Sequence, residues 1–88
     1  MEKYLDPKQF GLPPRTVLKE EANGYAVLVK KRKSRIIMKD GEKIKAIRDR
    51  LVQSGGYSGL ILETNAPVCS KTRKMLAESG IPVRELQT

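Results

Sequence analysis

The chain has 88 residues, of which 39% are hydrophobic and 32% charged, which is typical of one small globular domain and excludes a disordered segment. It carries 18 lysines and arginines against 10 acidic residues, a net charge of +8. This excess favours a polyanionic partner, most commonly nucleic acid, with a basic surface that only aids solubility as the alternative.

The first segment has the composition of an extended arm. Its prolines break any helix and push the residues before them toward extended backbone. We therefore expect residues 1–15 to form an extended N-terminal arm that Phe10 and Leu12 attach to the body. Residues 16–88 are expected to form a single α/β domain.

Three strands are expected next. Residues 16–20 and 25–29 are rich in apolar and β-branched residues, and the Asn-Gly pair between them is typical of a two-residue hairpin turn. Five cations within positions 30–35 then interrupt the apolar pattern. Residues 34–39 resume it, which predicts a third strand and a second hairpin whose tip carries the basic run.

From residue 40 onward the spacing of apolar residues becomes that of a helix. Ile44, Ile47 and Leu51 recur at the helical period and form one apolar stripe. Asp40 is the candidate N-cap, because its carboxylate can accept the unpaired amides of the first turn. A Gly-Gly pair after residue 54 ends the helix.

The remaining residues predict a second crossover. Residues 59–64 are expected to form a buried strand, a second helix begins at Cys69 or Ser70 and ends before Gly80, and residues 83–86 form the last strand. The resulting order, β-β-β-α-β-α-β, predicts an α/β fold with a small mixed sheet. Each helical crossover joins parallel strands, so the helices pack on the sheet.

The basic run is the main indication of function. Lysines and arginines this close together repel one another unless an anion such as a phosphate backbone neutralises them. Few aromatic residues lie among them, which favours backbone contacts over base stacking. We therefore expect a non-catalytic protein that binds DNA or RNA, with contacts from the basic run and from the start of the second helix: Lys30, Lys31, Arg32, Lys33, Arg35, Lys39, Lys71 and Arg73.

The sequence is also compatible with partners other than nucleic acid. The same cations suit an acidic protein partner, and lysines at a sheet edge also discourage aggregation. Small size and exposed sheet edges make a homodimer a reasonable expectation. We expect no cofactor, no metal site and no membrane partner, because histidine is absent, only one cysteine is present and the apolar runs are short. A single cysteine fits a reducing, cytoplasmic location.

Cys69 supports a different function. A cysteine at a helix start beside Lys71 and Arg73 has a favoured thiolate. The segment LETNAPVCSKTRKMLAESGIPVREL resembles the active-site strand, loop, helix and strand of glutaredoxins and arsenate reductases. That resemblance implies a thiol-redox or arsenate-reductase-like enzyme with Cys69 as nucleophile, although Thr72 stands where many members carry the resolving cysteine. The structural alternative is a small residue packed beside Thr72 and Leu76.

The element order and the segment GGYSGLILETNAPVCSKTRKMLAESGIPV also resemble the core of restriction-endonuclease-like nucleases. That resemblance implies a strand bearing Asp and a following strand bearing Glu-x-Lys, whose carboxylates hold a divalent metal for phosphodiester hydrolysis. Lys30 or Lys39 matches the lysine, but the glutamate position is then Leu28 or Ile37. Aliphatic side chains cannot bind a hard cation, so the resemblance implies a degenerate core. We therefore expect a protein without enzyme activity, the alternative being a nuclease whose carboxylates come from other positions.

Overall fold

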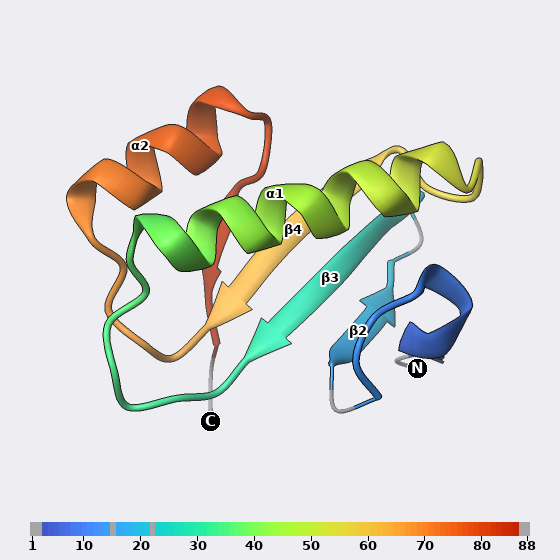
Figure 1. The fold of residues 1–88 in the computed structure, drawn as a ribbon, viewed down its shortest axis with the longest axis horizontal. Coiled ribbons are helices and arrows are strands. Elements are labelled where there is room, and N and C mark those ends of the chain that lie inside the picture. The colour runs from blue at the N-terminus through green and yellow to red at the C-terminus, as the bar shows by residue number, and fades with distance from the viewer. Residues whose placement is uncertain (1–2, 15, 22, 87–88) are drawn as a thin grey trace.

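Five strands form one sheet in the order β1-β2-β3-β4-β5 (Figure 1). In this computed structural model, which describes residues 3–14, 16–21 and 23–86, β1 to β3 are antiparallel neighbours, whereas β3, β4 and β5 run parallel. The strands span Lys3–Leu5 (β1), Val17–Glu20 (β2), Tyr25–Lys30 (β3), Gly59–Thr64 (β4) and Val83–Glu85 (β5), and the helices span Pro7–Phe10 (η1, a 3-10 helix), Met38–Gln53 (α1) and Ser70–Glu78 (α2).

The hydrophobic core lies between one face of the sheet and the two long helices. Both crossovers step in the same direction along the sheet, from β3 to β4 and from β4 to β5, and α1 and α2 lie on the same face (Figure 1). This is the arrangement expected when both crossovers have the usual right-handed sense. Side chains alternate along a strand, so Leu28 of β3 and Leu62 of β4 point into this core, where the α1 stripe predicted from the sequence supplies Ile44 and Leu51. Of the helices described, none has the length and apolar composition that crossing a membrane requires.

The predicted fold class is confirmed, including the order β-β-β-α-β-α-β. One predicted strand is wrong. Within residues 34–39 only Ile36 makes a β-bridge, to Val68, and α1 already begins at Met38. Asp40 is therefore not the N-cap but lies inside the first turn, where its carboxylate accepts the amide N–H of Ile37 at 3.1 Å and stabilises an earlier helix start.

The strand that completes the predicted order is β1, which lies in the segment expected to be an extended arm. Leu5 pairs with Leu18 across the β1–β2 ladder, and Phe10 and Leu12 pack against the core. The ring of Phe10 meets Tyr57 edge-on, with 6.0 Å between ring centroids. Residues 1, 2 and 15 of the expected arm lie outside the described residues, and the rest follows the body closely.

As a consequence, the basic run is not a hairpin tip. It follows β3 and leads into α1, so it joins two elements of a crossover rather than two antiparallel strands. Crossover loops at the carboxyl ends of parallel strands meet at one edge of the sheet. The expectation of a homodimer stays a prediction.

Candidate nucleic-acid interface

The loop after β3 and the loop after β4 lie side by side at the carboxyl edge of the sheet (Figure 1). Their backbones are joined, because the amide of Ile36 donates to the carbonyl of Pro67 at 2.8 Å and the amide of Cys69 donates to the carbonyl of Ile36 at 2.9 Å. The amide of Arg32 also donates to the side-chain oxygen of Asn65 at 3.1 Å. The two loops therefore form one connected surface.

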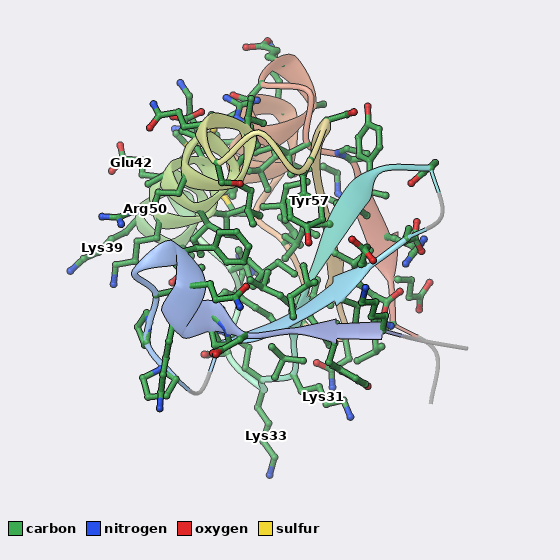
Figure 2. All side chains as sticks on the ribbon, turned by 90° about the vertical axis from the view of Figure 1, so that its right-hand side faces the viewer. Lys31, Lys33, Lys39, Glu42, Arg50 and Tyr57 are labelled. Carbon is green, nitrogen blue, oxygen red and sulfur yellow. The ribbon has the colours of Figure 1, made fainter. Side chains whose placement is uncertain are left out.

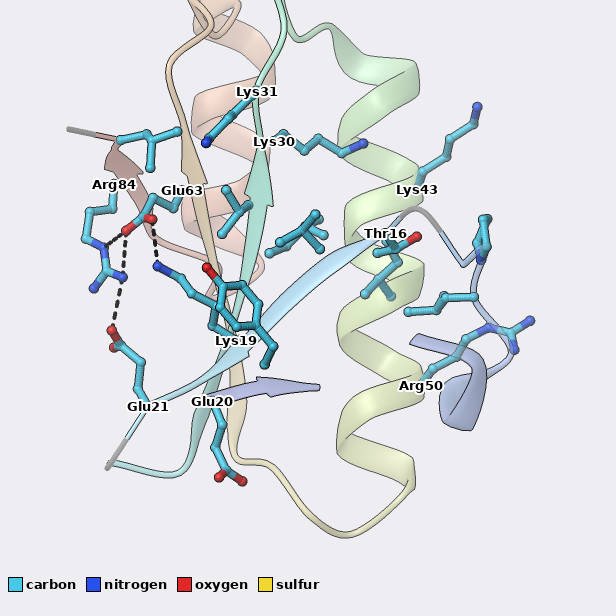
Figure 3. A pocket seen from close by; sticks show the side chains of 18 of the residues that line it. Thr16, Lys19, Glu20, Glu21, Lys30, Lys31, Lys43, Arg50, Glu63 and Arg84 are labelled. Carbon is cyan, nitrogen blue, oxygen red and sulfur yellow. Dashed lines mark hydrogen bonds and ion pairs between the residues drawn. The ribbon is translucent and has the colours of Figure 1, made fainter. Parts of the chain in front are cut away.

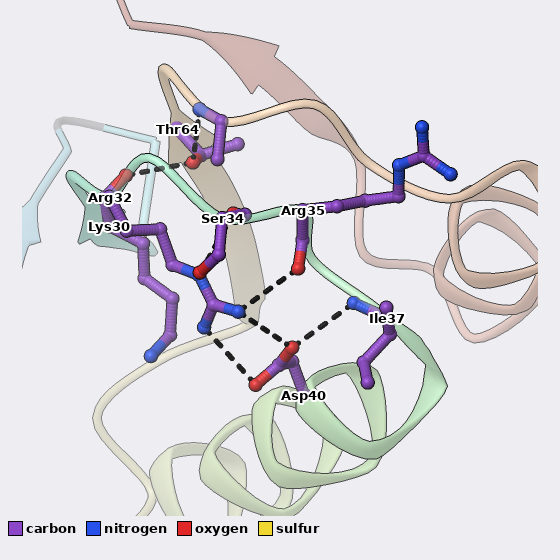
Figure 4. A network of polar contacts seen from close by, with 8 residues as sticks. Lys30, Arg32, Ser34, Arg35, Ile37, Asp40 and Thr64 are labelled. Atoms are coloured by element: carbon purple, nitrogen blue, oxygen red, sulfur yellow. Dashed lines mark hydrogen bonds and ion pairs between the residues drawn. The ribbon is translucent and has the colours of Figure 1, made fainter.

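Arg32 is the centre of the first loop (Figure 4). Its guanidinium donates to both carboxylate oxygens of Asp40, at 3.2 and 3.1 Å, and to the carbonyls of Ser34 and Arg35, at 3.1 and 3.0 Å. The hydrogen bond from the amide of Ile37 lowers the pKa of Asp40 most, and the hydrogen bonds and charge of Arg32 lower it further. The pKa of Asp40 therefore lies below its ordinary value. The charge of Arg32 is neutralised within the chain, so this residue shapes the loop rather than extending from it.

Six other cations at this edge are exposed. Lys33 and Lys31 project from the first loop, and Lys39 projects from the start of α1 (Figure 2). In the part of the chain that the structure describes, no carboxylate forms an ion pair with any of the six. We call this surface the basic edge; it consists of Lys31, Lys33, Arg35, Lys39, Lys71 and Arg73.

The start of α2 belongs to the same surface as the loop after β3. Arg35 extends toward α2 (Figure 4) and lies near enough to Cys69 to favour its thiolate. Both α1 and α2 begin at this edge, so their positive dipole ends add to the potential of the side chains. The structure thus brings together cations that lie more than thirty residues apart in the sequence.

Gly41 permits this close approach of the two helices, and sequence reasoning did not single it out. It is buried in α1, and a Cβ atom there would lie 2.6 Å from Cε of Met75 and 2.9 Å from Cγ2 of Thr72. Real side chains do not pack at such distances, so the absence of a side chain is what lets α1 touch α2 here. A glycine inside a predicted helix is the signal that would have identified it.

Lys30 lies apart from the basic edge. Its side chain extends from the end of β3 toward α1, where Lys43 lies, across a cleft that encloses about 1590 Å³ (Figure 3). This cleft is also lined by Thr16, Leu28 and Arg50. In the described ranges 3–14, 16–21 and 23–86, no group of three His, Cys, Asp or Glu side chains could hold a metal ion.

The residues beside Lys30 do not fit the metal that a restriction-endonuclease-like core implies. Leu28, two positions before Lys30, is 1% exposed and offers no oxygen ligand. Ile37 occupies the corresponding position before Lys39 and lies at the N-cap of α1, outside any strand. We therefore derive no metal-dependent step at either position.

Glu63, at the end of β4, has another role. Its carboxylate accepts from Lys19 at 3.1 Å and from Nε of Arg84 at 2.9 Å, and Arg84 also binds Glu21 at 3.0 Å (Figure 3). Burial raises the pKa of Glu63, but the hydrogen bonds from Lys19 and Arg84 outweigh it and keep the pKa below the ordinary value. These contacts tie β2, β4 and β5 together across the face of the sheet that α1 and α2 leave uncovered.

Cys69 is the N-cap residue of α2 and is partly exposed. Hydrogen bonds from the backbone amides of Lys71 and Thr72 lower the pKa of the Cys69 thiol, with the larger effect from Lys71. The positive charge of Arg35 lowers it further. Thr72 itself is fully buried, as expected for the inner face of the helix. The elements β4, α2 and β5 follow the order that the glutaredoxin resemblance implies, while redox activity stays a prediction.

No protein-family profile matches this sequence, and no curated protein matches it. Solved structures do match. EndoMS in a complex with double-stranded DNA has a TM-score of 0.73 at 21% identity, over 98% of this chain and 36% of that one. EndoMS in apo form has a TM-score of 0.69 at 19% identity, over 99% of this chain and 37% of that one. A repair endonuclease from Pyrococcus abyssi has a TM-score of 0.64 at 19% identity, over 81% of this chain and 31% of that one.

The chain therefore spans about a third of the length of each of these proteins. At such identities the similarity shows the fold alone. At that level it agrees with the resemblance to a restriction-endonuclease-like core, since one of the matched structures is that of a repair endonuclease. This chain has the α/β fold found in part of these proteins.

Proposed function

We propose that this chain binds nucleic acid through the basic edge, gripping the phosphate backbone without cleaving it, and that duplex DNA is its partner. The observation that supports this most is the gathering on one edge of six exposed cations that form no ion pair with any carboxylate of the described residues. The choice of duplex DNA is supported by the DNA complex among the solved structures of the same fold.

The physical basis is the release of counterions from the phosphates. Each phosphate contact made by a lysine or arginine contributes about −0.9 to the slope of log K against log salt concentration. The basic edge offers at most six such contacts, since Arg32 is neutralised by Asp40. Arg35 and Arg73 can also bind a phosphate in the bidentate manner that lysine cannot.

A titration of a short fluorescent duplex across salt concentrations tests this proposal. We expect a slope of about −3 to −5 for the unmodified chain, since not every cation reaches a phosphate. The variant Lys31→Ala/Lys33→Ala should bind about tenfold more weakly at low salt, with a slope smaller by about 2. Lys8→Ala/Lys45→Ala removes the same charge from exposed positions on η1 and along α1, and should change affinity much less.

The outcomes separate the proposal from its rivals. Equal losses in the two double variants would mean that net charge, not the basic edge, attracts DNA. Tighter binding of structured RNA than of the duplex would contradict the choice of DNA. No binding of either polymer at low salt would exclude the proposed function and leave an acidic protein as the partner to test.

Incubating the bound duplex with Mg²⁺ or Mn²⁺ tests the absence of cleavage. We expect the duplex to stay intact, because Leu28 stands where the nuclease pattern needs a carboxylate. Cleavage that disappears in Lys30→Ala would contradict this expectation, since it would show that catalytic groups remain around Lys30. Cleavage that persists equally in Lys30→Ala would instead indicate a contaminating nuclease, and removing it by further purification would restore the expected result.

A further inference from the structure

Two large apolar side chains are exposed at the basic edge. Ile36, Ile37 and Met38 form one apolar run, yet Ile36 is fully buried, whereas Ile37 is 48% exposed and Met38 is 39% exposed. A strand at 34–39 would have buried part of this run, but the structure has none there. Burial in the hydrophobic core therefore explains why residue 36 is apolar, but it does not explain the apolar side chains of Ile37 and Met38.

The exposed pair is held on a rigid base. The backbone of Ile36 is bonded on both sides, to Pro67 and to Cys69. The amide of Ile37 is bound by Asp40, which Arg32 holds with two further hydrogen bonds (Figure 4). Because this scaffold is already ordered, little conformational entropy is lost when a partner covers the two side chains.

Cations that form no ion pair within residues 3–14, 16–21 and 23–86 surround the pair. Arg35 precedes it in the loop, Lys39 follows it in α1, and Lys33 projects from the same loop (Figures 2 and 4). A partner that covers Ile37 and Met38 must therefore present apolar surface close to negative charge. A duplex does so, because its stacked bases lie just inside two rows of phosphates.

We propose that Ile37 and Met38 form an apolar wedge that inserts against a base step of bound duplex DNA and partly unstacks it. The wedge rests on the proposed function, since the basic edge must first hold the phosphates on either side. Isoleucine and methionine are among the residues that DNA-bending proteins insert in this way, and the cost of unstacking is offset by the apolar contact and by closer phosphate contacts.

A duplex carrying 2-aminopurine at successive positions tests the wedge, because the fluorescence of this base rises when it is unstacked. We expect the unmodified chain to raise the fluorescence at one or two adjacent positions by at least about twofold. The variant Ile37→Ala/Met38→Ala should abolish the rise. Its affinity should fall by less than about tenfold, because the lost contact is balanced by the unstacking that is no longer needed, and its salt slope should stay unchanged.

Val52→Ala is the matched control, since Val52 is 42% exposed at the opposite end of α1 and should leave the fluorescence rise intact. Binding of the duplex by the unmodified chain without a rise at any position would overturn the wedge and leave the proposed function standing. A rise that survives in Ile37→Ala/Met38→Ala would also overturn it. Failure to bind any duplex would overturn both proposals.

Discussion

Replacing Glu63 with glutamine is expected to lower the free energy of unfolding by about 3 kcal/mol. Glutamine keeps the shape of the side chain but removes the charge that faces Lys19 and Arg84. The side chain of Lys19 is only 12% exposed, so its ammonium group would lose the opposite charge of Glu63 in a poorly solvated position. Urea denaturation followed by circular dichroism measures the difference.

Glu78→Gln is the control for this prediction, because Glu78 is exposed on α2 and its neutralisation should change stability by less than about 0.5 kcal/mol. A loss no larger in Glu63→Gln than in Glu78→Gln would show that the contacts between β2, β4 and β5 contribute little net stability. Such a result would mean that the cost of desolvating the charges cancels their attraction.

The same network predicts how stability depends on pH. The pKa of Glu63 is lower in the folded chain than its ordinary value of 4.5, so the unfolded chain takes up its proton first as the pH falls. The stabilisation is therefore complete above the unfolded pKa and is lost as the pH falls through the folded pKa. Asp40 contributes in the same direction, so the difference between the unmodified chain and Glu63→Gln isolates Glu63. Parallel stability curves between pH 6 and pH 3 would contradict this assignment.

Replacing Arg32 with lysine is expected to weaken DNA binding about fivefold, even though the charge is unchanged and Arg32 is not part of the basic edge. Lysine cannot bind both oxygens of Asp40 while also donating to the carbonyls of Ser34 and Arg35. The loop would then be ordered only on binding, which costs free energy. We also expect the free energy of unfolding to fall by about 2 kcal/mol.

Arg73→Lys makes the same chemical change at an exposed position of the basic edge and serves as the control. Fluorescence titration gives the affinities and urea denaturation gives the stabilities of both variants. If Arg32→Lys loses stability but binds DNA as tightly as the unmodified chain, the order of the loop does not matter for binding. If both variants lose affinity equally, Arg32 itself contacts phosphate in the bidentate manner, which contradicts its assignment to shaping the loop.

Several features of this protein were determined by local sequence. Apolar and β-branched content predicted β2, β3 and β4 near their observed bounds, and the stripe of Ile44, Ile47 and Leu51 predicted α1. Gly80, with a φ of 76°, ends α2 as expected. These predictions were correct because strand and helix periods act over a few residues and the side chains that they align must be buried somewhere. The density of cations was equally visible in the sequence.

The tertiary structure alone decided which of those cations face solvent and what surrounds them. Arg32 and Lys33 are equivalent in the sequence, but Asp40 binds the first and leaves the second exposed. The strand expected at 34–39 gave way to a loop because Ile36 pairs with the segment after β4, while the missing strand came from residues 3–5 through pairing with β2. Such partners lie far along the chain, and the free energy that selects them comes from contacts that no local pattern contains.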